Sequence, residues 1–288
     1  MTFLSILIAL LIERSLPQLK RFRRFDWLRD YGRWMVEVLQ IDKLGPWAGL
    51  ALLLAPLLLA VWLLYSIFHS AFFGLFELAF GVVVVYLTLG PRELDPEVDD
   101  YLDALDVDEA RARASAAAPL LDEETPSELS EQARTVARSL FSEALIRVYA
   151  PIFWFALLGP VAAVVYRLLE RLQRHAGLLD ESLSGLRGPA RELLGWMDWI
   201  PARLSLFAYM VAGRFDDGWQ AFRRGVALAS DLYEQNVELL RQVGAASIGL
   251  PEEIGSAPAA AAEVRKARGL ILRSLVIWLL LILALSLL

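Results

Sequence analysis

The 288-residue chain contains no cysteine. This absence excludes disulfide bonds, a thiolate nucleophile and any zinc or iron–sulfur site built on cysteine. Histidine is nearly as scarce, because His69 and His175 are the only two, so a site with several histidine ligands is also excluded. The sequence has neither a phosphate-binding glycine loop followed by lysine nor a Gly-x-Ser-x-Gly motif. No standard catalytic constellation is present, and we expect no metal and no cofactor.

Apolar residues, in contrast, are abundant. They make up 57% of the chain, and the mean hydropathy is +0.48, values typical of a membrane protein. A membrane-spanning helix needs about 20 apolar residues. Three runs meet this requirement: residues 47–68, 72–90 and 270–288.

Three further apolar segments are short or interrupted. Residues 1–12 precede charged residues and indicate a retained helix, not a signal peptide. Residues 141–169 are broken by Pro151 and by Gly159-Pro160, and residues 196–213 carry charges. Such broken helices are expected where the backbone lines a cavity. The sequence predicts an all-α polytopic helical membrane protein with broken or re-entrant helices and amphipathic surface helices.

This pattern divides the chain into seven segments. They are a short membrane helix (1–13), a basic amphipathic cytoplasmic segment (14–46), a transmembrane hairpin (47–90), an acidic cytoplasmic segment (91–140), a broken-helix membrane core (141–213), a polar helical segment (214–268) and a C-terminal transmembrane helix (269–288).

Charge in the connecting segments predicts an orientation. Eight Lys and Arg lie in residues 14–46, and basic loops favour the cytoplasmic side. We therefore expect a multi-pass protein of the bacterial inner (plasma) membrane whose partner is the lipid bilayer, with no nucleic-acid partner. The carboxyl terminus lies outside if both broken segments span, and inside if one of them is re-entrant.

The polar segments give further expectations. The acidic residues between Glu93 and Glu109 lack the closing pattern of a calcium loop and predict a solvated acidic face. A helix entering the membrane follows, with Ser127 or Ser130 as its N-cap. Residues 244–269 are rich in Gly, Pro and Ala and predict a loop before the last helix.

Ionisable side chains within apolar segments are candidate functional residues, because burying a charge in a membrane is costly. Glu77 lies far enough into its segment to need protonation or a partner, and a structural ion pair with an arginine is the alternative interpretation. Glu13 and Arg14 end a short helix, where they can instead reach the interface. Arg147 and Arg167 flank the broken segment.

Arg203 poses the same question in the stretch "DWIPARL". Asp198 can cap a helix that begins at Trp199, and Pro201 in the first turn costs no hydrogen bond. Arg203 then projects from the second turn into apolar surroundings. It needs a carboxylate, an anionic headgroup or an anionic ligand as partner.

Three blocks of sequence resemble the AmpE family of inner-membrane proteins. They are "LIERSLP" at the amino end, "VYAPIFWFALLGPVAAVVYRLLERL" at residues 148–172 and "DWIPARL" at residues 198–204. The resemblance implies a regulatory role in inducible β-lactamase expression, linked to cell-wall recycling and the response to antibiotics.

The chain is also distantly similar to the CobD/CbiB membrane enzymes of cobalamin synthesis. Residues 150–153 and Tyr166-Arg167 match one block of that family, and residues 200–204 match its "IPARL" block. This resemblance implies a synthase that joins an aminopropanol unit to a corrinoid acid. Residues 168–175 read "LLERLQRH" where that family has "NTLDSMVG".

Three functions therefore stay open. The first is a non-enzymatic modulator or sensor that holds an anionic, anhydromuropeptide-like molecule or a protein partner near Arg203 and Arg167. The second is an ATP-using, amide-forming synthase similar to CobD/CbiB. The third is a transporter of wall fragments, although the sequence shows no internal repeat of the kind transporters have.

Overall fold

The computed structural model describes residues 1–15, 27–69, 74–90, 94–107, 109–121, 124–174, 181–225 and 229–287. These residues form helices joined by short connections, and no strand occurs among them. The fold class predicted from the sequence is confirmed: the protein is all-α. The chain divides into two compact units, each assembled from segments far apart in the sequence, and each is described separately below.

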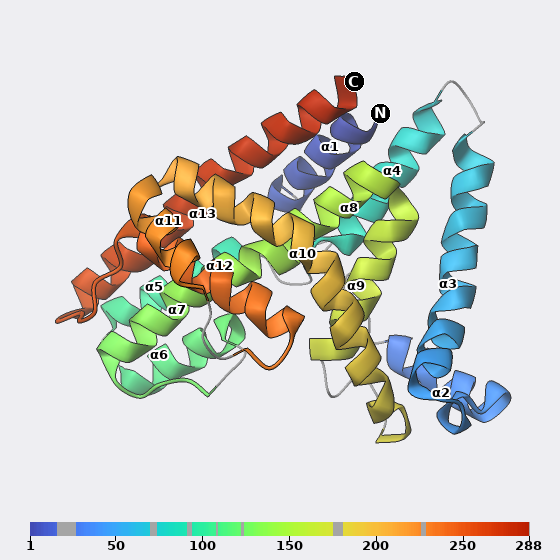
Figure 1. The fold of residues 1–288 in the computed structure, drawn as a ribbon, viewed down its shortest axis with the longest axis horizontal. Helices are drawn as coiled ribbons and strands as arrows, with labels where there is room; N and C mark the ends of the chain where they lie inside the picture. Colours follow the sequence, from blue (N-terminus) through green and yellow to red (C-terminus); the bar gives the residue numbers. More distant parts are fainter. Residues whose placement is uncertain are drawn as a thin grey trace. The chain divides into compact units, whose positions relative to one another are not determined.

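The first unit comprises Met1–Pro91, Ala150–Asp198 and Ile282–Leu288. Its helices are α1 (Thr2–Ser15), α2 (Trp27–Leu39), η2 (Ile41–Lys43), α3 (Pro46–His69), α4 (Leu75–Thr88), α8 (Ala150–Leu158), α9 (Pro160–Arg174), η7 (Glu181–Leu186) and the first part of α10 (Arg187–Ala212) (Figure 1).

Close backbone approach holds the first unit together. Helix α1 packs against α4, where a Cβ on Gly81 would lie 2.7 Å from the Ser5 hydroxyl oxygen. Helix α8 packs against α9, which also contacts α3. The Tyr31 hydroxyl in α2 donates a hydrogen bond of 2.9 Å to the Leu53 carbonyl in α3. Residues on both sides of the predicted hairpin loop thus belong to one packed unit.

The second unit comprises Arg92–Tyr149 and Trp199–Leu281. Its helices are α5 (Leu94–Asp106), α6 (Ala110–Ala117), η4 (Ala118–Leu120), α7 (Leu129–Ala144), the π-helix η5 (Leu145–Tyr149), the remainder of α10, α11 (Phe215–Arg224), α12 (Leu232–Ile248) and most of α13 (Ala257–Leu287).

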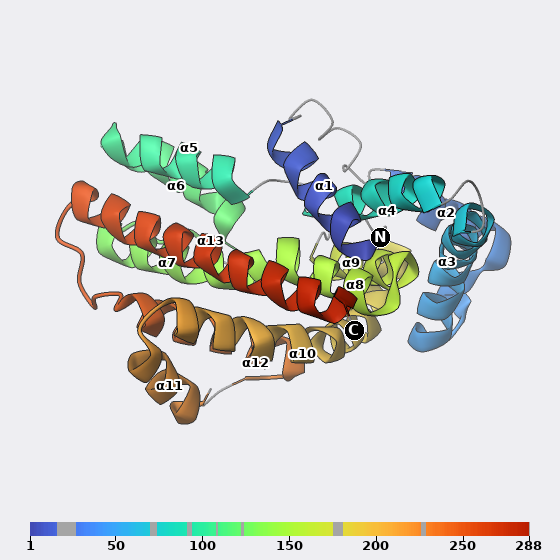
Figure 2. The ribbon, with the colours of Figure 1, turned by 90° about the horizontal axis from the view of Figure 1, so that it is seen from above.

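Helix α7 is central to the second unit. It packs against α12, which also packs against α11, while α5 packs against α6 (Figures 1 and 2). Gly244 of α12 faces the Phe141 ring of α7 so closely that a Cβ there would overlap the ring. The Tyr209 hydroxyl of α10 donates to the Phe141 carbonyl at 2.8 Å. A glycine thus gives the Phe141 ring room against α12, and a hydrogen bond links α10 to α7.

Three helices are long and apolar enough to cross a membrane: Pro46–Phe68, Leu129–Leu158 and Ala257–Ala284. They differ in burial, because 17% of the apolar stretch of Pro46–Phe68 is buried, compared with 78% for Leu129–Leu158. Exposed Leu and Trp side chains along α3 need an apolar environment. The protein is therefore a membrane protein, as the composition predicts.

Several local predictions are wrong. Helix α10 runs unbroken from Arg187 to Ala212, so Asp198 lies inside the helix and is not an N-cap. Pro201 also lies within the interior of this helix. The broken segment is interrupted at Gly159, which has a φ of 82°, whereas Pro151 lies within helix. Glycine tolerates this left-handed conformation and ends α8 there.

The ends of the polar segments also differ from prediction. Glu128, and not Ser127 or Ser130, caps α7: its carboxylate accepts from the Ser130 and Glu131 backbone N–H groups, both at 2.9 Å. The predicted loop at residues 244–269 is mostly helix, because α12 continues to Ile248 and α13 begins at Ala257. Alanine-rich sequence favours helix, which the loop prediction underestimated.

Candidate functional site

Arg147 lies in a π-helical turn within the long apolar segment. The π-turn spans Leu145–Tyr149, between α7 and α8. Such turns are rare and often occur at functional sites, because the extra residue changes the direction in which side chains project. Arg147 is buried, with 7% of its surface exposed. A buried guanidinium needs acceptors, and the second unit supplies three.

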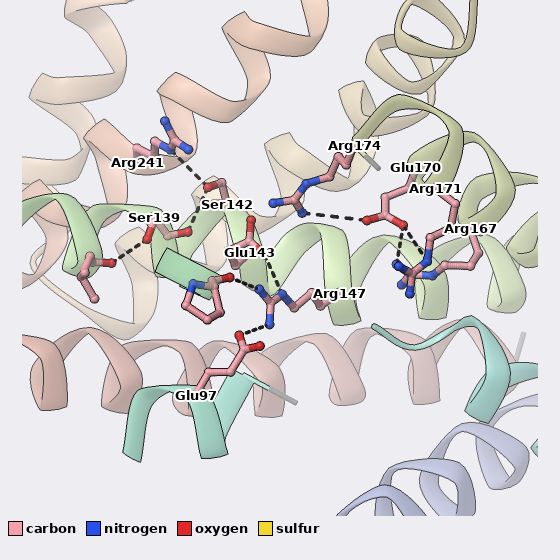
Figure 3. A network of polar contacts seen from close by, with 12 residues as sticks. Glu97, Ser139, Ser142, Glu143, Arg147, Arg167, Glu170, Arg171, Arg174 and Arg241 are labelled. Carbon is pink, nitrogen blue, oxygen red and sulfur yellow. Dashed lines mark hydrogen bonds and ion pairs between the residues drawn. The ribbon is translucent and has the colours of Figure 1, made fainter. Parts of the chain in front are cut away.

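The Arg147 cluster consists of one guanidinium and two carboxylates (Figure 3). Arg147 Nη1 lies 2.5 Å from Glu97 Oε2, and Nε lies 2.6 Å from Glu143 Oε2. Nη2 donates to the Pro119 carbonyl at 3.1 Å. With all groups ionised, the cluster carries one net negative charge in a buried setting. Such a network stabilises only while every partner is present.

Glu97 departs from the prediction made for the acidic segment. The sequence predicts a solvated acidic face, but Glu97 is 9% exposed and pairs with Arg147. Asp95 and Asp99, from the same helix, pair with Arg268 of α13 at 2.8 and 2.6 Å. Part of the acidic segment therefore binds arginines within the second unit, which its charge alone did not reveal.

A second charged cluster, the α9 cluster, lies in the first unit. Its members follow the i, i+3, i+4, i+7 pattern of one helix face in α9: Arg167, Glu170, Arg171 and Arg174 (Figure 3). Arg167 is 1% exposed, donates from Nε to the Thr88 carbonyl at 2.6 Å, and donates from Nη1 to Glu170 Oε2 at 3.0 Å. Glu170 Oε2 lies 3.6 Å from Arg171 Nε, and Glu170 Oε1 lies 3.9 Å from Arg174 Nη1. One carboxylate thus faces three guanidinium groups.

Asp198 is the most enclosed carboxylate of the first unit. Its exposed fraction is 0%, and Oδ1 accepts a hydrogen bond of 2.8 Å from the Tyr166 hydroxyl. Within the described part of the chain, Oδ2 is buried and has no hydrogen-bond partner. A buried carboxylate oxygen of this kind is costly and is often found at functional sites. Asp198 therefore has one oriented oxygen and one oxygen open to a further contact.

The same region joins two blocks of sequence that lie about 30 residues apart. Tyr166 precedes Arg167 in the first block, and Asp198 begins the second, so their hydrogen bond connects the blocks directly. Trp154 of the first block adds a hydrogen bond from Nε1 to the Met197 carbonyl at 3.2 Å. The structure thus brings together Asp198, Tyr166 and the helix that carries Arg167.

Arg203 belongs to the second unit and has a different setting. It is half-buried and donates to Oδ1 of Asn236 and, at 3.3 Å, to the Trp199 carbonyl. Its guanidinium carbon lies 4.8 Å from the centre of the Trp199 ring, a cation–π contact. Among the described residues, its side-chain hydrogen-bond partner is a neutral amide, and the expected carboxylate, anionic headgroup or anionic ligand stays a prediction. Arg203 follows Asp198 by five positions, which places them about 140° apart around α10.

The remaining predicted residues lie elsewhere in the first unit. Glu77 of α4 is half-buried and lines a cavity of about 50 Å³ with Ser5, Tyr65 and Phe155. Glu13 is half-buried near the end of α1. Arg14 is in the same helix, but its side chain is outside the described part.

Sequence reasoning missed several buried polar residues. Glu170, Arg171 and Arg174 were seen only as a departure from a family pattern, although their helical spacing on an amphipathic segment was a usable signal. Glu143 also had a usable signal, because it lies four residues before Arg147 on a predicted helix. Glu97 gave none, because only folding brings it to Arg147. Within the described residues, no group of three or more His, Cys, Asp or Glu is placed to hold a metal ion.

Comparison with known proteins gives the family. The model of the family described as CobD/Cbib protein matches residues 6–232, which include both blocks joined by Tyr166 and Asp198. The chain belongs to the CobD/CbiB family. No solved structure matches it.

Three curated relatives carry the name cobalamin biosynthesis protein CobD. The protein of Chromobacterium violaceum is 29% identical over 205 residues, covering 70% of this chain and 62% of the relative. That of Stutzerimonas stutzeri is 31% identical over 172 residues, covering 55% and 51%. That of Pelobacter propionicus is 32% identical over 132 residues, covering 43% and 39%. This CobD/CbiB chain thus spans less than two thirds of the length of each.

These matches correct the main functional prediction. The proposed modulator of β-lactamase induction was based on a resemblance to AmpE, and the matching family and relatives do not support that assignment. The CobD/CbiB similarity, treated as distant in the sequence, extends over most of the chain. The error arose because the blocks shared by the two families were assigned to the wrong one.

Proposed function

We propose that this CobD/CbiB chain is a membrane-bound, amide-forming synthase of cobalamin biosynthesis that joins an aminopropanol-type amine to a corrinoid acid. The observation that carries the proposal is the family match over residues 6–232. The names of the three relatives, cobalamin biosynthesis protein CobD, support the same pathway. The chain covers only part of the length of each relative, so its activity is a proposal.

The site that we propose combines Asp198, Tyr166 and the α9 cluster. Forming an amide from a carboxylate and an amine removes the elements of water, so a nucleoside triphosphate is needed to activate the carboxylate. The amine must also lose a proton as the bond forms. Asp198 Oδ2 is a buried carboxylate oxygen available to accept that proton, while Tyr166 fixes the position of Oδ1.

The arginines of the α9 cluster support binding of anionic substrate groups. The carboxylate of Glu170 contacts three guanidinium groups, those of Arg167, Arg171 and Arg174. In these contacts the guanidinium groups outnumber the carboxylate. Guanidinium groups bind carboxylates and phosphates through paired hydrogen bonds, and both groups occur in an acid and a nucleotide. Residues 168–175 differ from the "NTLDSMVG" pattern, so we propose that Glu170 and its arginines set how this chain holds its acid.

We also propose a multi-pass location in the bacterial inner membrane, with residues 14–46 on the cytoplasmic side. The basic residues of that segment support this side, and a cytoplasmic location gives access to nucleotides.

The test is rescue of a bacterial strain that lacks its CobD-type synthase, at normal expression, combined with an assay of the purified protein. The assay supplies a corrinoid acid, aminopropanol or its phosphate, and ATP with magnesium. We expect rescue and nucleotide-dependent product. Absence of both, with the protein present in the membrane, would contradict the proposal.

Single substitutions test which residues carry the proposed activity. Asp198→Asn keeps the shape of the side chain but removes the proton acceptor, and we expect loss of product by about 100-fold or more, the contribution typical of a general base. Arg138→Ala, which breaks a half-exposed ion pair with Glu238 outside the proposed site, is the matched control and should retain activity. Full activity of the Asp198→Asn protein would contradict the proposed role of Asp198 as proton acceptor, but it would not contradict the proposed amide-forming reaction.

A further inference from the structure

Helix α11 carries a row of aromatic side chains that the described part of the protein covers only partly. Phe215 and Trp219 are 45% and 44% exposed, and Phe222 follows at helical spacing. Neighbouring rings along the row are stacked, with centroids 6.5 Å apart for Phe215 and Trp219 and 5.7 Å apart for Trp219 and Phe222. Three adjacent aromatic residues form a continuous apolar ridge, which in water would be unfavourable.

The orientation of this aromatic row is fixed by packing on an adjacent face. Gly218 and Ala221 are the buried residues of α11. A Cβ on Gly218 would lie 2.6 Å from the Ser247 hydroxyl oxygen and 2.7 Å from Met210 Cγ, so α11 approaches its neighbours closely. The Arg214 backbone N–H also donates to the Ser247 carbonyl at 2.8 Å, just before α11 begins. The helix therefore cannot rotate to bury its aromatic row within the unit.

The third face of α11 is polar and ends in positive charge. Asp216 and Asp217 lie in the first turn, and Arg223 and Arg224 lie in the last turn. At 100° per residue, Gln220 lies about 100° around the helix from Trp219, so residues next to each other in sequence sample different faces. An aromatic ridge beside a charged face, with Arg at one end, is the pattern of a helix lying in a membrane interface.

Other parts of the second unit already require lipid. Helix α13 exposes Leu272, Val276 and Leu280, which are spaced four residues apart in a candidate membrane span. Helix α10 exposes Phe207 and Val211, and α11 begins at Phe215 only three residues after α10 ends. The exposed apolar positions of α10 thus continue along the chain directly into the aromatic row.

We propose that α11 is an interfacial anchor: it lies in the headgroup layer of the bilayer, with Phe215, Trp219 and Phe222 directed toward the acyl chains and Arg223 and Arg224 at the level of the lipid phosphates. Aromatic side chains are favoured at this depth, and arginine contacts phosphate while its stem covers apolar surface. This placement revises the view of residues 214–268 as a purely polar segment. It does not depend on the proposed synthase reaction.

The natural absence of cysteine makes the test direct. Single variants Trp219→Cys and Gln220→Cys are labelled with a nitroxide in the full chain, reconstituted into vesicles of phosphatidylethanolamine and phosphatidylglycerol. Collision with oxygen, which concentrates in acyl chains, is compared with collision with a water-soluble nickel complex. We expect oxygen to dominate at position 219 and nickel at position 220.

Phe215→Cys provides a second position on the aromatic row, where we also expect oxygen to dominate. It keeps the test valid if replacement of Trp219 perturbs the fold. Dominance of nickel at both 215 and 219 would place the row in water and overturn the proposal. Protection of these positions from both oxygen and nickel would also overturn it, because the row would then be covered by protein, such as a second copy of the chain.

Discussion

Residues 46–68 and residues 129–158 are both long and apolar enough to cross a membrane, yet their surroundings differ. Only 17% of the apolar stretch of the first is buried, compared with 78% of the second. The first contains no Asp, Glu, Lys or Arg, whereas the second holds Glu143 and Arg147. Apolar length therefore identifies a candidate span, but packing decides whether lipid or protein surrounds it.

The Arg147 cluster offers the strongest way to test this contrast. Arg147→Ala removes the guanidinium that the buried carboxylates of Glu97 and Glu143 both contact, so we expect a loss of about 3–5 kcal/mol in the free energy of unfolding. Denaturant unfolding of the purified protein in detergent measures this loss. Arg138→Ala, in α7 and in a half-exposed pair with Glu238, should cost about 0–1 kcal/mol. Equal effects would mean that the Arg147 cluster is not buried as the structure has it.

One substitution can be compared in both segments. Leu140 is 0% exposed and Leu59 is 55% exposed. Leu140→Ala should lower the free energy of unfolding by about 2–5 kcal/mol, because it leaves a cavity. Leu59→Ala in detergent should change it by about 0.5 kcal/mol or less, because the side chain has few protein contacts. Thermal unfolding of the two variants checks the difference, and a larger effect at Leu59 would show that protein covers α3.

The tight contact between α7 and α12 gives a third test. A Cβ on Gly244 would overlap the buried Phe141 ring, so Gly244→Ala should destabilise the protein by about 1–3 kcal/mol through overpacking. Gly269 in α13 has open space around its Cβ position, and Gly269→Ala should instead be neutral or stabilising by up to about 1 kcal/mol. The melting temperature of Gly244→Ala should therefore be clearly lower than that of Gly269→Ala. A Gly244→Ala protein as stable as the wild type would contradict the close contact between Gly244 and Phe141.

The smallest expected effect concerns the start of the buried segment. Hydrogen bonds from the Glu131 and Ser130 backbone N–H groups hold the pKa of Glu128 below its ordinary value of 4.5. A lowered folded-state pKa stabilises the fold above the ordinary value, and this contribution is lost as pH falls through the lowered pKa. We expect Glu128→Ala to reduce the acid sensitivity of unfolding. Glu124→Ala, at an exposed position before the helix, is the control, and an identical pH profile for wild type and Glu128→Ala would refute the capping role.

The candidate site was predictable in part. The blocks containing Arg167 and Asp198 are visible in the sequence, as are the ionisable residues within apolar segments. Their partners were not predictable, because Tyr166 meets Asp198 and Glu97 meets Arg147 only after helices distant in sequence pack together. Arg203 shows the limit clearly: its apolar surroundings predicted an anionic partner, and gave no indication that Asn236 and the Trp199 ring would contact it.

The sequence by itself determined that the protein is helical and lies in a membrane, because hydropathy and segment length depend only on composition and order. It also contained the break at Gly159-Pro160, since a glycine followed by proline locally disfavours continued helix. Only the tertiary structure decided which apolar segment forms the buried core, which acids are solvated and which arginines are neutralised. Those outcomes depend on burial and on short-range contacts between segments that are distant in sequence. The order of residues along the chain does not say which of these segments lie close together in space.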